Sequence, residues 1–265
     1  MLRTNGRTRA GFTLIELLVV VTIIGILASI LVVAVYRAVV TATAAARKAE
    51  VKNLETALES NAISEGQGRN YPPDFTDLAR VKLYLYKRFP RIAKTEVDAI
   101  SGLALTPPQA LVFWLRGVSI DPVYPFTGPG GPLSASPTSA FDFDQSQLRA
   151  DPANSSSPHM AYFPRGSNAP FVYFVARPGA NPAYVGAYDL SGQGLGIAVP
   201  YRKDNNQGFC SPSSFQIISA GADGDYGNSA AANPRYYPSG TGYAPGDADN
   251  VVNFARESTL IGDKP

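Results

Sequence analysis

An apolar run near the N-terminus restricts the possible folds of this chain more than any other feature of its sequence. From residue 12 to residue 35 the only charged side chain is that of Glu16. A run of about 20 apolar residues is long enough to cross a bilayer as a helix. An acidic side chain inside such a run raises the free energy of membrane insertion by roughly 2.5–3.5 kcal/mol. Its presence there is therefore taken to indicate a functional role. We therefore expect residues 12–35 to form a membrane-spanning helix in which Glu16 has a specific role.

The residues in front of this run form a short basic leader, residues 1–11. The sequence G-F-T-L-I-E-L, from Gly11 to Leu17, resembles the prepilin signal of the type IV pilins and the type II secretion pseudopilins. The resemblance implies that a prepilin peptidase cuts after Gly11 and methylates Phe12 as the new N-terminus. It also implies that Glu16 acts in assembly. The motif covers the leader and the front of the helix, but not the rest of the chain.

Two simpler interpretations of the same run remain open. A secretory signal peptide has an apolar core of about 7–15 residues, whereas this run is longer and contains Glu16. A signal anchor that only tethers a soluble domain would leave the cost of Glu16 unexplained. We favour assembly, because in a bundle of subunits Glu16 can pair with the amine of Phe12 on a neighbouring subunit. Such pairing removes the penalty of a lone buried charge.

The resemblance also implies a location and a set of partners. The chain is expected in the bacterial inner membrane as a single-pass protein, with its leader in the cytoplasm and its head in the periplasm. It would then join a periplasmic or surface filament. The expected partners are further copies of the chain in a helical filament, the prepilin peptidase, an inner-membrane assembly platform, other pseudopilins and the membrane. The basic residues on the two sides of the run do not fix the orientation by themselves.

The composition argues against a nucleic acid partner and against an enzyme. The formal net charge is +2, and removal of Arg3, Arg7 and Arg9 with the leader gives 2 − 3 = −1. No strongly basic surface is therefore expected. His159 is the only histidine, which excludes a zinc site with several histidines. The sequence motifs of serine hydrolases, P-loop nucleotidases and zinc proteases do not occur in the chain.

Residues 36–66 are expected to continue the helix as an amphipathic segment. Neither proline nor glycine occurs in this segment before Gly66, and alanine, the strongest helix former, is frequent. The glycines at 66 and 68 are predicted to end the helix. Apolar residues at spacings of three and four form a stripe that would face the core of the head: Val51, Leu54 and Leu58.

The head, residues 67–265, is expected to be α+β, with the long helix packed on a small antiparallel sheet and with helical and loop insertions, as the resemblance to pilins also implies. One helix is predicted to start at Asp74 or Thr76 as N-cap and to end near Arg88. A second is predicted from Thr106 as N-cap to Arg116. Loops are predicted over 121–137 and 142–170. The predicted strands are residues 171–175, 184–188, 196–201 and 215–219.

Acidic residues gather in two segments after the last predicted strand. Residues 219–225 read S-A-G-A-D-G-D and residues 247–250 read D-A-D-N. They resemble the C-terminal loop of the major pseudopilin of type II secretion, which binds calcium. The matching residues are Asp223 and Asp249, with Asp225 and Asp247 as nearby additions.

Calcium takes 6–8 oxygen ligands, including main-chain carbonyls, so a few aspartates would suffice. The stretch between the two segments is longer than in that family, which leaves the second aspartate open. The segment is not an EF-hand, because the twelfth position from Asp223 is Pro234. Asp-Gly pairs also occur as plain turns, and this alternative stays open.

Cys210 is the only cysteine, so the chain can form no internal disulfide. An exported head without disulfides must be held together by its core or by a metal ion. A single cysteine is most often simply buried.

The favoured function is that of a structural subunit of a type II secretion pseudopilus, assembled through its N-terminal helix after leader cleavage. The alternative is a type IV pilus subunit whose enlarged head serves in adhesion or DNA uptake. The enlargement lies mainly in residues 69–170.

Overall fold

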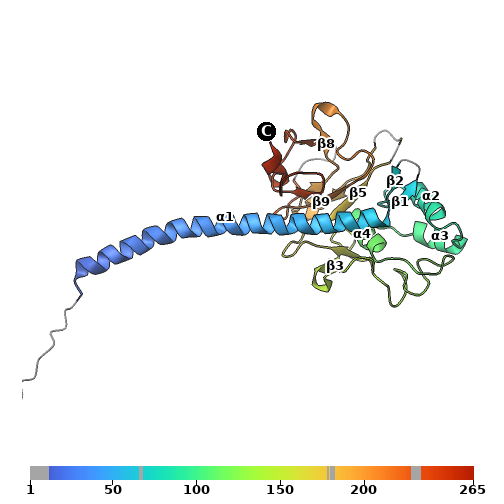
Figure 1. Ribbon diagram of the computed structural model, residues 1–265, viewed down its shortest axis with the longest axis horizontal. Coiled ribbons are helices and arrows are strands. Elements are labelled where there is room, and N and C mark those ends of the chain that lie inside the picture. Colours follow the sequence, from blue (N-terminus) through green and yellow to red (C-terminus); the bar gives the residue numbers. More distant parts are fainter. Residues whose placement is uncertain (1–11, 66–67, 178, 180–182, 228–233) are drawn as a thin grey trace, which may run out of the picture. The chain divides into compact units, whose positions relative to one another are not determined.

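The computed structural model describes residues 12–65, 68–177, 179, 183–227 and 234–265. The chain divides into two compact units, Met1–Thr43 and Ala44–Pro265, and each is described by itself. Helix α1, Leu14–Asn61, contributes residues to both units. The expected long N-terminal helix is therefore confirmed (Figure 1). The expected leader, residues 1–11, lies outside the described residues.

In the first unit, α1 satisfies its own polar groups. The hydroxyl of Thr22 donates to the carbonyl of Val19 at 2.8 Å, and that of Ser29 donates to the carbonyl of Ile26 at 2.7 Å. Within a bilayer, polar groups must find partners inside the segment because no water is available. The hydroxyl groups of this apolar helix are thus compatible with a lipid environment.

In the second unit, α1 buries one side against the head. The predicted stripe is confirmed, since Val51, Leu54 and Leu58 are all completely buried. They pack on helix α4, Pro107–Leu115, and on strands β5 Val172–Val175, β9 Phe215–Ser219 and β11 Val251–Val252. Figure 1 shows the ribbons of this region beside the back part of α1.

The prediction that the helix ends at its glycines was wrong, because α1 ends at Asn61. Strands β1, Ile63–Glu65, and β2, Gly68–Asn70, follow it as an antiparallel hairpin. The guanidinium of Arg69 donates to the carbonyl of Glu59 at 3.0 Å and so satisfies part of the open helix end. Gly68 therefore belongs to strand β2 and not to a helix cap, whereas Gly66 lies outside the described residues.

Three shorter helices follow in the head: α2 Leu78–Arg88, α3 Lys94–Ser101 and α4 Pro107–Leu115. Thr106 caps α4 as predicted, in a reciprocal capping box with Gln109. The predicted cap of α2 was wrong, because Asp77 takes that position and accepts from two backbone N–H groups. Asp74 is buried instead, and its carboxylate accepts from the backbone of Val175 at 2.9 Å. Helix α3 was not predicted.

The largest sheet has three strands in the antiparallel order β11-β9-β5. Its strands are β5 Val172–Val175, β9 Phe215–Ser219 and β11 Val251–Val252. The strands β5 and β9 confirm two predicted strands, whereas β11 was not predicted. An antiparallel pair also lies inside the predicted loop over residues 142–170, and the loop prediction is wrong there. Its strands are β3 Leu148–Ala150 and β4 Met160–Tyr162.

The remaining strands form two short pairs. The antiparallel pair is β6 Tyr188–Asp189 with β7 Ile197–Ala198, and the parallel pair is β8 Arg202–Lys203 with β10 Tyr236–Tyr237. The strands predicted over 184–188 and 196–201 thus shrink to two residues each. Short 3-10 helices complete the head: η1 Gln145–Gln147, η2 Ser191–Gln193, η3 Asp204–Asn206, η4 Pro245–Asp247 and η5 Leu260–Asp263. The α+β class is confirmed, with several small sheets in place of one.

Candidate functional site

The first turn of α1 positions Glu16 through a reciprocal pair of hydrogen bonds. The backbone N–H of Thr13 donates to Glu16 Oε2 at 2.9 Å, and the Thr13 hydroxyl donates to the same oxygen at 2.8 Å. The backbone N–H of Glu16 in turn donates to Thr13 Oγ1 at 3.3 Å. This is a capping box, which satisfies backbone groups that the start of a helix otherwise leaves open. Glu16 therefore has a local role within a single chain.

The capping box was not part of the sequence-based interpretation, although the sequence carries its signal. Thr13 followed three residues later by Glu16, just before an apolar run, is the typical pattern. Phe12 directly precedes the box and is 79% exposed. Gly11, the predicted cleavage position, lies outside the described residues.

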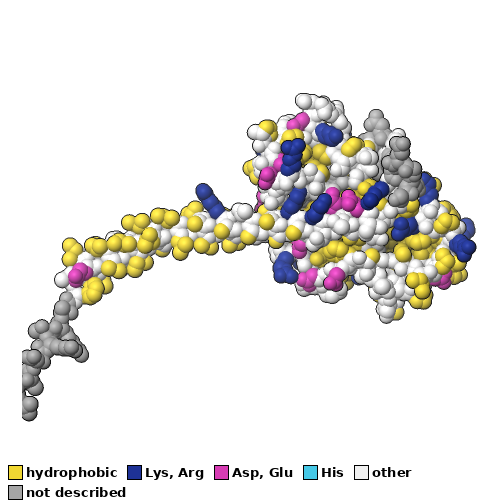
Figure 2. Space-filling model, viewed as in Figure 1, with side chains coloured by type: hydrophobic (Ala, Val, Ile, Leu, Met, Phe, Trp, Pro, Cys, Tyr) yellow, Lys and Arg dark blue, Asp and Glu magenta, His cyan; other side chains and the backbone are white. Residues whose placement is uncertain are grey.

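The front part of α1 exposes its apolar side chains on every side. They include Leu14, Ile24 and Val39, with exposed fractions of 82%, 59% and 58%. Figure 2 shows apolar side chains covering this part of the helix. Among the described residues, α1 is the one helix that is long and apolar enough to cross a membrane. Such a surface is stable in lipid or against other apolar helices, and it is unfavourable in water.

The predicted acidic residues come from two turns that meet beside the end of β9. Asp249 Oδ2 accepts from the backbone N–H groups of Ala222 at 2.5 Å and Asp223 at 3.3 Å. A Cβ atom added to Gly221 would lie 2.0 Å from the carboxyl carbon of Asp249, so only glycine fits there. The buried Asn250 accepts from the backbone N–H of Gly221 at 3.1 Å. The structure thus brings Asp223 and Asp249 together.

Two features set the electrostatics of this pair of turns. Burial raises the pKa of Asp223, and the nearby charges of Asp249 and Asp225 raise it further. Asp249 Oδ1 is buried and has no hydrogen-bond partner among the described residues. The Arg47 guanidinium on α1 compensates part of this negative charge. Burial lowers the pKa of Arg47, whereas attraction to Asp249 acts in the opposite direction.

Asp247, also predicted as a metal ligand, has a different set of partners. Its Oδ1 lies 2.8 Å from Arg235 NH1, and both side chains are fully buried. The Tyr201 hydroxyl donates to the same oxygen at 2.8 Å, and the Ala244 backbone N–H donates to Oδ2 at 2.8 Å. Asp247 is therefore committed to a buried ion pair. The role of Arg235 was not predicted from the sequence.

The side-chain hydrogen bond of Asp225 is local, although its carboxylate also lies close to Gly196 and Gly246. Its Oδ1 accepts from the backbone N–H of Gly227 at 2.9 Å, which is the geometry of a tight turn. Asp223 Oδ1 accepts in the same way from the backbone N–H of Asp225 at 2.9 Å. The segment from Asp223 to Gly227 therefore contains the turn chemistry of the simpler interpretation.

The donor set was tested against calcium, which needs 6–8 oxygen ligands. No group of three or more His, Cys, Asp or Glu side chains within the described ranges is arranged to hold a metal ion. The unpartnered Asp249 Oδ1 beside Asp223 fits a calcium ligand, provided that main-chain oxygens complete the set. Asp247 does not fit, because Arg235 and Tyr201 occupy its carboxylate.

The second unit also holds its C-terminal segment to α1 through Lys48. The Lys48 ammonium donates to the carbonyls of Val252 at 2.8 Å and Ala255 at 2.6 Å. The neighbouring Arg47 donates to the carbonyl of Ala220 at 3.4 Å. Two adjacent basic residues of the helix thus bind the chain segments on both sides of the acidic turns.

Comparison with known proteins gives one match, and it lies at the N-terminus. The prokaryotic N-terminal methylation motif matches residues 6–32. No curated protein and no solved structure matches the chain. The matched segment contains Phe12, the capping box of Thr13 and Glu16, and the exposed apolar front of α1. Together, the methylation motif and the long apolar helix that carries it support placing this chain among the type IV pilin-like proteins.

Proposed function

We propose that the chain is a structural subunit of a type II secretion pseudopilus. One observation carries this proposal: the front of α1 is apolar, exposed on every side, and bears a single carboxylate at its start. A helix that is apolar all round requires lipid or other helices around it. Copies of the same helix supply such a surface in a filament.

In the proposed maturation, a prepilin peptidase cuts after Gly11 and methylates Phe12. The new amine of Phe12 then lies one residue before the capping box of Thr13 and Glu16. In the membrane, the Glu16 carboxylate accepts hydrogen bonds from Thr13 at the start of its own helix. In the filament, the amine of a neighbouring subunit adds the counter-charge that the capping box does not supply. Mass spectrometry of the mature N-terminus tests the cleavage, and a chain that still begins at Met1 contradicts it.

The capping box dictates the variants that test the role of Glu16. Glutamine at this position retains the capping box and removes the charge, whereas alanine removes both. We expect Glu16→Gln and Glu16→Ala to insert into the membrane normally and to assemble poorly. Thr13→Val is the matched control, because it loses the side-chain half of the box and keeps the charge.

Electron microscopy of filaments provides the measurement. If charge pairing drives assembly, Thr13→Val forms filaments and Glu16→Gln does not. Normal filaments from Glu16→Gln would refute charge pairing and leave helix capping as the only role of Glu16.

We further propose that Asp223 and Asp249 bind calcium with main-chain oxygens of the same turns. The support is the unpartnered buried Oδ1 of Asp249 and the resemblance of this loop to that of the major pseudopilin. When bound, the ion supplies the positive charge that Arg47 now provides in part. Asp225 lies at the edge of the site, and Asp247 stays with Arg235.

Thermal melting of the purified chain tests calcium binding. Calcium should raise the melting temperature and a chelator should reverse the rise. Asp249→Asn should abolish the effect, whereas Asp144→Asn, which removes a partly exposed carboxylate outside the acidic turns, should leave it intact. Because Arg47 competes for the same carboxylates, Arg47→Gln should bind calcium more tightly. An unchanged melting temperature with and without calcium contradicts the proposal.

The proposed location is the bacterial inner membrane, with the head in the periplasm and later in a periplasmic filament. The proposed partners are further copies, other pseudopilins and the assembly platform. The alternative function is that of a type IV pilus subunit with an adhesive or DNA-binding head. Loss of a secretion subunit should trap exported enzymes in the cell, whereas a pilus subunit should appear in long sheared surface fibres.

A further inference from the structure

A pocket of about 360 Å³ opens on the head, away from the acidic turns. The end of β8 and η3 line one part of it, together with residues 207–211. The end of β10 and the segment that follows β11 line the rest. Nothing in the proposed filament role uses this pocket. Ligand pockets in proteins are commonly of this size, with an apolar lining and a few polar groups.

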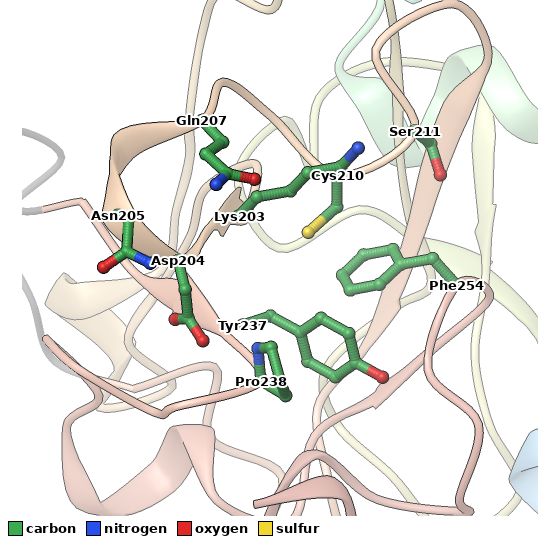
Figure 3. A pocket seen from close by; sticks show the side chains of 9 residues that line it. All are labelled: Lys203, Asp204, Asn205, Gln207, Cys210, Ser211, Tyr237, Pro238 and Phe254. Carbon is green, nitrogen blue, oxygen red and sulfur yellow. The ribbon is translucent and has the colours of Figure 1, made fainter.

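The floor of the pocket is aromatic. The rings of Tyr237 and Phe254 lie 5.2 Å apart at an interplanar angle of 77°. Figure 3 shows both rings and the sulfur of Cys210 facing the same space. The Tyr237 hydroxyl donates to Asp263 at 2.9 Å, which holds the ring in place. Burial raises the pKa of the Cys210 thiol to about 12, so this thiol stays neutral and acts as part of the apolar floor.

The rim of the pocket is polar. Asn205 and Gln207 are exposed, and their side-chain amides make no hydrogen bond to any residue in the described part of the chain. The carboxylate of Asp204 is occupied, because it accepts from the backbone N–H of Ser239 at 3.1 Å and from its hydroxyl at 2.5 Å. The rim therefore offers amide donors and acceptors, with Lys203 as an additional donor.

The backbone of the rim supports a binding role. Asn205 and Ser211 both have positive φ values, of 58° and 50°. This conformation is unfavourable for residues with a side chain, and it tends to occur at ligand-binding sites. The carbonyl of Ser211 is fixed in addition by the Tyr184 hydroxyl at 2.6 Å.

We propose that this pocket binds a pyranose sugar. The C–H face of a sugar ring packs on an aromatic surface, and its hydroxyl groups donate and accept at the same time. The two rings of the floor match the first property, and the free amides of Asn205 and Gln207 match the second. A wholly apolar ligand would make no hydrogen bond to these amides. A phosphate would meet the negative charge of Asp204 at the rim.

Saturation-transfer NMR on the full chain tests the proposal, in a detergent without a sugar headgroup. The probes are the neutral sugars methyl glucoside, methyl galactoside, methyl mannoside and N-acetylglucosamine. We expect saturable binding of at least one probe, with a dissociation constant on the order of 1 mM. The absence of saturable binding by every probe overturns the proposal.

The rim is tested by Asn205→Gly and Gln207→Ala, since glycine accepts the positive φ at 205. We expect each variant to weaken binding at least fivefold. Gln193→Ala removes an exposed amide outside the pocket and should leave binding unchanged. An equal loss in all three variants, or no loss in the rim variants, contradicts a role of the rim amides.

The floor is tested by a pair of variants at Tyr237. Tyr237→Phe keeps the ring and loses only the hydrogen bond to Asp263, so binding should persist within twofold. Tyr237→Leu removes the ring and should abolish binding, while thermal melting monitors whether the head is still folded. Retention of sugar binding by a folded Tyr237→Leu variant overturns the proposal. A glycan array then distinguishes a terminal sugar of a larger glycan from a free monosaccharide.

Discussion

Two stretches of α1 differ completely in what surrounds them, although one continuous helix contains both. The front, from Leu14 to Val39, exposes large apolar side chains on every side. The back buries a narrow stripe through Val51, Leu54 and Leu58, and residues of the head cover this stripe. Helix propensity does not explain the difference in surroundings, because the β-branched residues of the front are poorer helix formers than the alanines of the back, and both stretches are helical. The difference teaches that the back is completed by its own chain, whereas the front requires lipid or further subunits.

The largest effect is expected from removal of residues 1–43. The remaining unit, Ala44–Pro265, contains all the buried clusters of the described residues. We expect it to leave the membrane fraction entirely and to remain folded and monomeric. Cell fractionation and analytical ultracentrifugation provide the measurements. A truncated chain that aggregates or unfolds would show that the head depends on the front of α1.

The next largest effect is expected at the buried ion pair of the head. Arg235→Met leaves the carboxylate of Asp247 without its buried counter-charge, which costs about 3–5 kcal/mol of unfolding free energy. Denaturant unfolding of the truncated head measures this loss. Lys94→Met is the matched control, because its pair with Asp98 is exposed and contributes less than about 1 kcal/mol. Similar losses in both variants would contradict the importance of burial.

A smaller loss is expected where α1 binds the C-terminal segment. Lys48→Met removes two hydrogen bonds from an ammonium group to the carbonyls of Val252 and Ala255, at a cost of about 1.5–3 kcal/mol. The control on the same helix is Lys52→Met, whose ammonium contacts only Glu55 near the surface. If the back of α1 depends on the head, only Lys48→Met lowers the unfolding free energy clearly.

The smallest effect is a pH dependence that arises in the head. Burial raises the pKa of Asp74 above its ordinary value, although hydrogen bonds from Thr76 and Val175 oppose this shift. The folded state then keeps a proton that the unfolded state has released. Stability must therefore fall as the pH rises from about 4 through the raised pKa.

The Asp74→Asn variant removes this titration. Unfolding free energies measured between about pH 3 and pH 7 should fall less with rising pH in the variant than in the original chain. The surroundings of α1 do not affect the difference between the two pH profiles, because Asp74 and its hydrogen-bond partners all belong to the head. Identical pH profiles would show that folding does not shift the pKa of Asp74.

Sequence patterns predicted those helices and strands that are determined by residues close together in the chain. The apolar run and the stripe at Val51 predicted α1, Thr106 with Pro107 predicted the start of α4, and the apolar segment of β9 predicted a strand. The strands β3, β4 and β11 have only two or three residues. Their pairing is decided by distant segments, and such short runs show no periodicity of their own.

The residues of the candidate site also fall into those that local spacing predicts and those that it does not predict. The capping box of Thr13 and Glu16 follows from residue spacing alone. The pairing of Asp247 with Arg235 does not, because it depends on how a long connection folds back. Composition indicated an acidic cluster, but only the geometry separates Asp247 from Asp223 and Asp249.

The bonds of Lys48 have a consequence for the order of events during synthesis. The residues that cover the back of α1 include Phe215, Ile217 and Val251, and the carbonyls that receive Lys48 lie at 252 and 255. All of them leave the ribosome long after the helix itself. Part of the buried stripe of α1 must therefore stay uncovered until translation is almost finished. A ribosome that stops early releases a chain already equipped to enter the membrane but unable to close its head.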